Sequence, residues 1–121
     1  MLHGRTTLSK FIIEEQRRLE GGAELIALVN DIQTACKFIA AAVARGALGQ
    51  GAVTTVNVQG EQQKALDVIA NEIFLRTCES GGALAGMVSE EMDNPYPVPD
   101  AANRGPYLLV YDPLDGSSNI D

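Results

Sequence analysis

The segment from Tyr107 to Asp115 constrains the fold most, because a short apolar run ends in two closely spaced aspartates. The run from Tyr107 to Tyr111 is continuously apolar, which is typical of a strand that is buried on both faces of a parallel sheet. Asp112 would then lie at the carboxyl end of this strand, where open α/β sheets place their ligands. The sequence therefore predicts an α/β fold with an acidic site at a strand end.

The turn after this strand suits cation and phosphate binding. Pro113 keeps Asp112 extended, and the turn that follows lets Asp112 and Asp115 point towards one spot. Gly116 permits close backbone approach, and two residues suited to a helix start come next: Ser117 and Ser118. Free N–H groups at a helix start bind phosphate, and Mg²⁺ selects carboxylates. The turn predicts phosphate-ester chemistry, with a solvated surface turn as the plainer alternative.

Helical periodicity dominates the first two thirds of the chain. The predicted elements are a helix that starts at residues 6–9 and ends at Gly21, a helix from about Leu25 to Gly46, a helix from about Glu61 to Cys78, and a strand at residues 85–89. Residues 46–60 are rich in glycine and threonine, and they read as a loop or a weak strand. The proline-rich residues 93–105 read as a loop.

Further acids follow the other predicted strand. Glu90 and Glu91 come directly after residues 85–89, as Asp112 comes after its own strand. Two parallel strands that end in acids could bring four carboxylates into one cleft, where they repel unless cations lie among them. Asp67 lies one position after the apolar Leu66 on the third helix. Taken singly, an acidic surface turn and a solvated helical acid are the more ordinary interpretations.

Composition narrows the class of protein. A chain of 121 residues with 45% hydrophobic residues suits one small domain. The net charge of −7 argues against nucleic acids and anionic membranes as partners. The sequence shows neither a secretory signal nor an apolar run near the roughly 20 residues of a membrane span, so we expect a cytoplasmic protein. Cys36 and Cys78 are predicted to fill the core.

Three ordered blocks resemble a known enzyme family. Asp112-Pro-Leu-Asp-Gly-Ser-Ser-Asn-Ile-Asp121 is similar to the metal-binding signature of class 1 fructose-1,6-bisphosphatases, which belong to the lithium-sensitive sugar and inositol phosphatases. Val88-Ser-Glu-Glu91 and Gly60-Glu-Gln-Gln-Lys-Ala-Leu-Asp67 resemble two further blocks of that family. The resemblance implies a layered α/β/α fold and hydrolysis of the 1-phosphate of fructose 1,6-bisphosphate to fructose 6-phosphate and phosphate.

The resemblance also implies roles for individual residues. The groups that would hold Mg²⁺, or Mn²⁺, are the side chains of Glu90, Asp112 and Asp115 and the carbonyl oxygen of Leu114. The residues that would orient and deprotonate the attacking water are Glu91 and Asp67. The backbone amides that would hold the 1-phosphate belong to Gly116, Ser117 and Ser118. A homotetramer is expected, with residues 46–58 as a mobile loop that closes over the cations.

Several alternatives stay open from the sequence. Members of the family are much longer than this chain, so the resemblance implies an N-terminal part that is inactive by itself and lacks the C-terminal substrate domain. A sedoheptulose-1,7-bisphosphatase or an inositol-type monophosphatase would use a similar acidic site. A non-catalytic metal-binding module is the third alternative.

Overall fold

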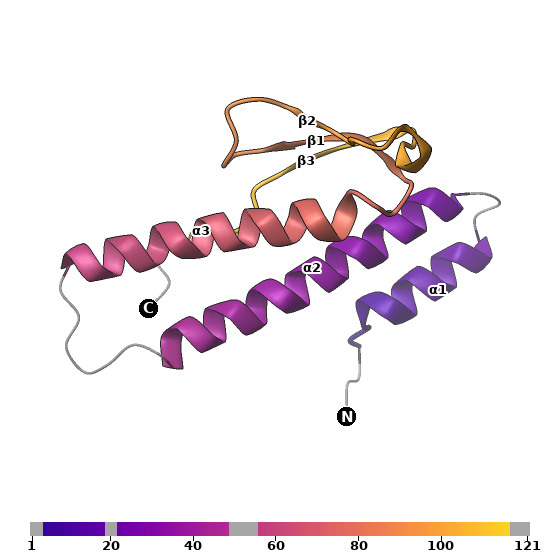
Figure 1. The fold of residues 1–121 in the computed structure, drawn as a ribbon. Helices are drawn as coiled ribbons and strands as arrows, with labels where there is room; N and C mark the ends of the chain where they lie inside the picture. The colour runs from indigo at the N-terminus through magenta and orange to yellow at the C-terminus, as the bar shows by residue number, and fades with distance from the viewer. Residues whose placement is uncertain (1–3, 19–21, 49–55, 117–121) are drawn as a thin grey trace.

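A computed structural model describes residues 4–18, 22–48 and 56–116 of the chain. Helices come first and a small sheet follows, as expected for the α/β class (Figure 1). The elements are α1 (Leu8–Arg18), α2 (Ala23–Leu48), α3 (Val56–Cys78), β1 (Leu84–Ser89), β2 (Tyr96–Pro97), the 3₁₀ turn η1 (Ala101–Asn103) and β3 (Tyr107–Tyr111).

Local signals set most helix boundaries. Thr7 caps α1, because its Oγ1 accepts a 3.1 Å hydrogen bond from the backbone N–H of Lys10. Gly22 has a φ of 82° and separates α1 from α2. One boundary prediction was wrong: α3 begins at Val56, so residues 56–60 are helical and not loop or strand. A single glycine within a helix costs only about 1 kcal/mol, which the packing of α3 along α2 can offset. Residues 49–55 lie outside the described part.

The sheet has the strand order β2-β1-β3, and β1 and β3 run parallel. Ser89 pairs with Tyr111, so both strands end at the same level. The short β2 pairs antiparallel with β1. Both β2 and η1 lie in residues 93–105, which were predicted as loop only. Two hydrogen bonds help to order this segment. The Tyr96 hydroxyl donates a 2.6 Å hydrogen bond to Glu79 Oε2, and Arg104 Nε donates a 2.8 Å hydrogen bond to the Val98 carbonyl oxygen.

The helices cover one face of the sheet. In Figure 1, α2 and α3 lie side by side and antiparallel beneath it, and α1 packs against α2 on the side away from α3. Along β3 the side chains therefore alternate, and Leu108 and Val110 are 61% and 69% exposed. The prediction that this strand is buried on both faces was wrong for the described residues. A continuous apolar run shows that both faces tolerate burial, but it does not show what covers them.

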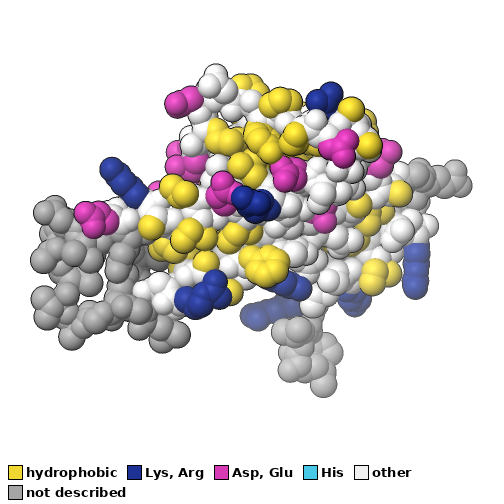
Figure 2. All heavy atoms as spheres, in the orientation of Figure 1, with side chains coloured by type: hydrophobic (Ala, Val, Ile, Leu, Met, Phe, Trp, Pro, Cys, Tyr) yellow, Lys and Arg dark blue, Asp and Glu magenta, His cyan; other side chains and the backbone are white. Residues whose placement is uncertain are grey.

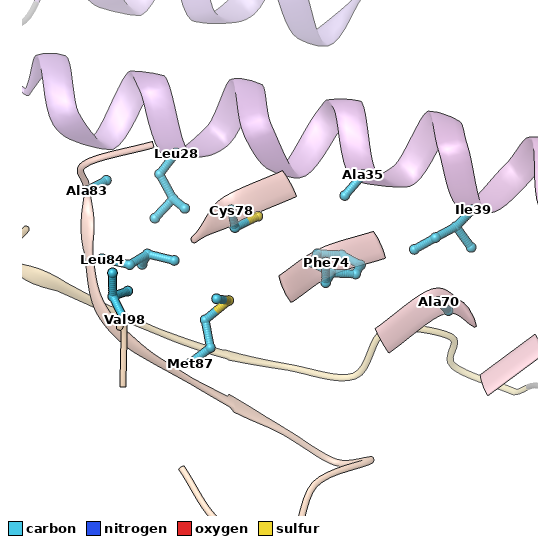
Figure 3. Close-up of a cluster of buried hydrophobic side chains, with 10 residues drawn as sticks. All are labelled: Leu28, Ala35, Ile39, Ala70, Phe74, Cys78, Ala83, Leu84, Met87 and Val98. Carbon is cyan, nitrogen blue, oxygen red and sulfur yellow. The ribbon is translucent and has the colours of Figure 1, made fainter. Parts of the chain in front are cut away.

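The core lies between α2, α3 and the inner face of the sheet. Its buried side chains, drawn in Figure 3, are Leu28, Ala35, Ile39, Ala70, Phe74, Cys78, Ala83, Leu84, Met87 and Val98. The core-filling prediction is confirmed for Cys78 and wrong for Cys36, which is exposed. Cys36 follows the buried Ala35 by one position, which turns its side chain by about 100° around α2.

Helix α2 is more apolar than we predicted from the sequence. The stretch Ala23–Gly46 of α2 has a mean hydropathy of 1.4, so by length and composition it could cross a membrane. This finding corrects the expectation that no run approaches such a length. A single helix of this kind is weak evidence, because core helices of soluble proteins pass the same test.

Gly105 determines how closely β3 approaches the start of β1. Its N–H donates a 3.0 Å hydrogen bond to the Leu84 carbonyl oxygen, and a Cβ at Gly105 would overlap backbone atoms of Gly82 and Ala83. We expect Gly105→Ala to lower the free energy of unfolding by about 1–3 kcal/mol, since the backbone must move apart. Urea unfolding measures this, with Gly60→Ala on α3 as a control that has open space and should stabilise by up to about 1 kcal/mol. An unchanged stability of Gly105→Ala would contradict this packing.

Candidate active site

The acids that directly follow the two parallel strands, β1 and β3, lie close together. Because Ser89 and Tyr111 are paired, Glu90 and Asp112 leave the sheet side by side, and the Glu90 N–H donates a 3.1 Å hydrogen bond to the Tyr111 carbonyl oxygen. One carboxylate oxygen from each of Glu90, Glu91 and Asp112 lies within 4.8 Å of the others. All three side chains are exposed. The structure thus brings together three acids that the sequence placed at two strand ends.

The turn after β3 orients Asp112. Its Oδ1 accepts a 3.2 Å hydrogen bond from the Leu114 N–H, and Pro113 between them is buried. Asp115 is exposed and lies outside the cluster of three, although its charge contributes to the raised pKa of Glu90. Gly116 has a φ of 65°, a conformation that glycine adopts without strain. Ser117 and Ser118 lie outside the described residues, so the predicted phosphate cradle is described only at Gly116.

Crowding of negative charge shifts two carboxyl groups. The pKa of Glu90 is raised, first by a hydrogen bond that its protonated form donates to Asp112 and then by the charge of Asp112. The pKa of Glu91 is raised by partial desolvation and by the charges of Asp67 and Asp112. These acids favour an added positive charge, which a proton or a cation can supply. Carboxylate oxygens at such separations suit a hard divalent cation.

Asp67, on α3, lies outside the cluster of three but close enough for its charge to act on Glu91. The side chain is half-buried, its Oδ1 is buried, and its charge acts on Glu91. The ordinary interpretation of Asp67 as a solvated helical acid is therefore wrong. Three elements, α3, β1 and β3, each contribute acid to one region.

Polar residues that the sequence reading did not single out lie beneath these acids. The Ser89 side chain is 3% exposed, and its Oγ accepts a 3.2 Å hydrogen bond from the Glu91 N–H. Ser89 pairs with Tyr111 on the neighbouring strand, and burial raises the pKa of Tyr111 while the Ser89 side chain opposes that rise. Tyr111 in turn donates a 3.3 Å hydrogen bond to Asn71 Oδ1. The sequence offered one signal for these residues, because Ser89 and Tyr111 each directly precede a candidate site acid.

An apolar groove lies beside Asp112. Its volume is about 540 Å³, and α2, α3 and the turn after β3 line it. The lining residues are Cys36, Ile39, Ala40, Val43, Ala44, Phe74, Asp112, Pro113 and Leu114. Apolar walls with one acid do not suit an anionic sugar phosphate. The chemistry for such a ligand lies on the acidic side of the turn.

Charge is unevenly distributed over the surface. Figure 2 shows most acidic side chains of this face over the sheet and α3, and most Lys and Arg side chains over the lower helices. On this face, acidic side chains are thus denser over the sheet and α3 than over the lower helices. Such a field raises the local concentration of cations.

The acid cluster should make the cation-free protein less stable as pH rises. Raised folded-state pKa values mean that the folded protein binds more protons than the unfolded chain, so stability falls as pH rises from the ordinary glutamate value of 4.5 through the raised values. We expect Glu90→Gln/Glu91→Gln, measured by urea unfolding in chelator, to gain more stability over the parent at pH 7 than at pH 4.5. Glu14→Gln/Glu61→Gln, at exposed helical positions, is the control. A gain that does not depend on pH would contradict the crowding.

Comparison with known proteins decides the family. The family profile described as "Fructose-1-6-bisphosphatase, N-terminal domain" matches residues 6–121. The chain belongs to the fructose-1,6-bisphosphatase family. It is 57% identical over 122 residues to the class 1 fructose-1,6-bisphosphatase of Methylacidiphilum infernorum (isolate V4), covering 100% of this chain and 34% of that protein. The class 1 enzyme of Hydrogenophilus thermoluteolus is 56% identical over 119 residues, covering 95% of this chain and 33% of that protein.

A solved fructose-1,6-bisphosphatase shares the fold. The crystal structure of the Leishmania major enzyme in holo form superposes with a TM-score of 0.73 at 33% identity, covering 96% of this chain and 34% of that chain. The resemblance noted in the sequence and the α/β fold class are thereby confirmed. The chain spans about a third of the length of the curated relatives it matches.

Proposed function

We propose that the full-length protein hydrolyses the 1-phosphate of fructose 1,6-bisphosphate and requires a divalent cation. The observation that carries this proposal is the convergence of Glu90, Glu91 and Asp112 from the ends of two parallel strands. Fructose-1,6-bisphosphatase is the printed name of both curated relatives, which supports the choice of substrate. The residues 1–121 alone should turn over poorly, because those relatives are about three times as long.

The donor set fits Mg²⁺, with Mn²⁺ as the alternative. Glu90 and Asp112 would hold the cation with clustered carboxylate oxygens, and Asp115 and the Leu114 carbonyl oxygen would complete the set from the same turn. All of these donors are oxygens, which is the preference of hard cations. When bound, the cation would supply positive charge that stabilises the oxygen of the departing sugar.

Glu91 is proposed as the base that takes a proton from the attacking water. Its pKa is raised by partial desolvation and by the charges of Asp67 and Asp112, which makes this carboxylate a stronger base than an isolated glutamate. The charge of Asp67 also raises the pKa of Glu91, so Asp67 would help orient the water and keep Glu91 basic. The backbone amides of Gly116, Ser117 and Ser118 would hold the phosphate.

The substrate is tested by phosphate release from the full-length protein. Fructose 1,6-bisphosphate should be the best substrate, ahead of sedoheptulose 1,7-bisphosphate and inositol monophosphate. A higher kcat/KM for either of the others would reassign the substrate, and no release from any of them would favour a non-catalytic metal-binding module. A homotetramer stays a prediction of the family resemblance, and a cytoplasmic location stays a prediction from the sequence.

A further inference from the structure

Strand pairing and side-chain hydrogen bonds beside the acid cluster join β1, β3 and α3. The Glu91 N–H donates to Ser89 Oγ, Ser89 pairs with Tyr111 across the two parallel strands, and the Tyr111 hydroxyl donates to Asn71 Oδ1. Each of the three linking side chains comes from a different element, namely β1, β3 and α3. The strand pairing and the Tyr111–Asn71 hydrogen bond therefore tie together segments that are far apart in the sequence.

Each linking residue lies within four positions of one of the acids. Ser89 directly precedes Glu90, and Tyr111 directly precedes Asp112. Asn71 lies four positions after Asp67, so the two share one face of α3. A displacement of any link would move the neighbouring acid with it.

The surroundings of the links suit a fixed geometry. Ser89 is buried, and Tyr111 and Asn71 are half-buried, so their hydrogen bonds are sheltered from competing water. The Tyr111 ring stacks on Phe74 with 4.7 Å between the ring centroids, which restrains the hydroxyl that it carries. The acids above repel one another, so packing and hydrogen bonds must hold them at cation-binding distance.

We propose that Tyr111, with Ser89 and Asn71, is a positioning residue that holds the carboxylates of Glu91, Asp112 and Asp67 at the separation a divalent cation requires. This inference rests on the proposed function, because it concerns the same site. The Tyr111 hydroxyl donates its hydrogen bond to Asn71, so in this proposal Tyr111 acts through the backbone and side chains that carry the acids. Groups that orient ligands in this way typically change metal affinity by about 10–100-fold when removed.

The test is a Mn²⁺ titration of the full-length protein without substrate, in which electron paramagnetic resonance measures free Mn²⁺. Tyr111→Phe keeps the stack on Phe74 and removes only the hydroxyl, and it should weaken Mn²⁺ binding by about tenfold or more. Tyr96→Phe is the matched control, since it removes a 2.6 Å hydrogen bond to Glu79, at the end of α3 away from Asp67. It should leave Mn²⁺ affinity unchanged even where it lowers the unfolding temperature.

A second variant shows whether the links act as a unit. Ser89→Ala should also weaken Mn²⁺ binding, and Ser89→Ala/Tyr111→Phe should lose less than the product of the two single effects. Parent-like Mn²⁺ affinity in Tyr111→Phe, or equal losses in Tyr111→Phe and Tyr96→Phe, would overturn the positioning role alone. A parent protein that does not bind Mn²⁺ would overturn both this role and the proposed function.

Discussion

Glu91→Gln is expected to lower the kcat of the full-length protein by about 10²–10⁴-fold, while Mg²⁺ affinity changes little. The amide keeps the size of the side chain but cannot take a proton from water. Partial desolvation is the largest cause of the raised pKa of Glu91, and the charges of Asp67 and Asp112 raise it further. Steady-state phosphate release at saturating Mg²⁺ measures the effect.

The neighbouring Glu90→Gln variant is the matched control for this assignment. Glu90 points at Asp112, with which its protonated form shares a hydrogen bond, so its loss should weaken cation binding first. We expect the Mg²⁺ concentration for half-maximal rate to rise in Glu90→Gln, with much of the rate restored at high Mg²⁺. If both variants lose Mg²⁺ affinity equally and neither has a separate rate defect, the division between base and ligand is wrong.

Asp112→Asn should remove most of the activity and most of the cation affinity. Asp112 is the acid at the end of β3 and acts on both glutamates, so its charge is central to the cluster. The asparagine Oδ1 can still accept the hydrogen bond from the Leu114 N–H, so the turn should survive. We expect the loss in Mg²⁺ affinity, measured by calorimetry, to exceed the roughly 10–100-fold typical of indirect effects.

A second ligand variant and a distant control accompany Asp112→Asn. Asp115→Ala should also remove most of the activity, because the family resemblance makes Asp115 a ligand. Asp100→Asn provides a distant control, since Asp100 caps η1 through a 3.0 Å hydrogen bond from the Ala102 N–H that asparagine can keep. Near-normal turnover of Asp112→Asn at saturating Mg²⁺ would contradict the assignment of Asp112, and a defect in Asp100→Asn would show that the assay reports stability.

Much of the acidic site could be predicted because its signals are local. The apolar run from Tyr107 to Tyr111 is β3 to the residue, and the acids after two parallel strands do converge. The place of Asp67 beside Glu91 came from the family resemblance, because a helical acid one position from an apolar residue has no local signal of its own. The roles of all these residues stay predictions.

Other features depend on contacts that are distant in the sequence. Cys36 and Leu25 fit the apolar stripe of α2, yet both are exposed, because the stripe in the sequence is wider than the face that α3 covers. The exposure of Leu108 and Val110 follows from which side of the sheet the helices occupy. The hydrogen bond between Tyr111 on β3 and Asn71 on α3 joins residues 40 positions apart, so no single segment could reveal it.

The central claim is that the acids at the ends of β1 and β3 bind a divalent cation that phosphate-ester hydrolysis requires. The most direct measurement is phosphate release from fructose 1,6-bisphosphate by the full-length protein, first after treatment with chelator and then with Mg²⁺ added back. We predict no detectable release in chelator and full recovery on addition of Mg²⁺. Equal turnover with and without chelator would contradict the claim.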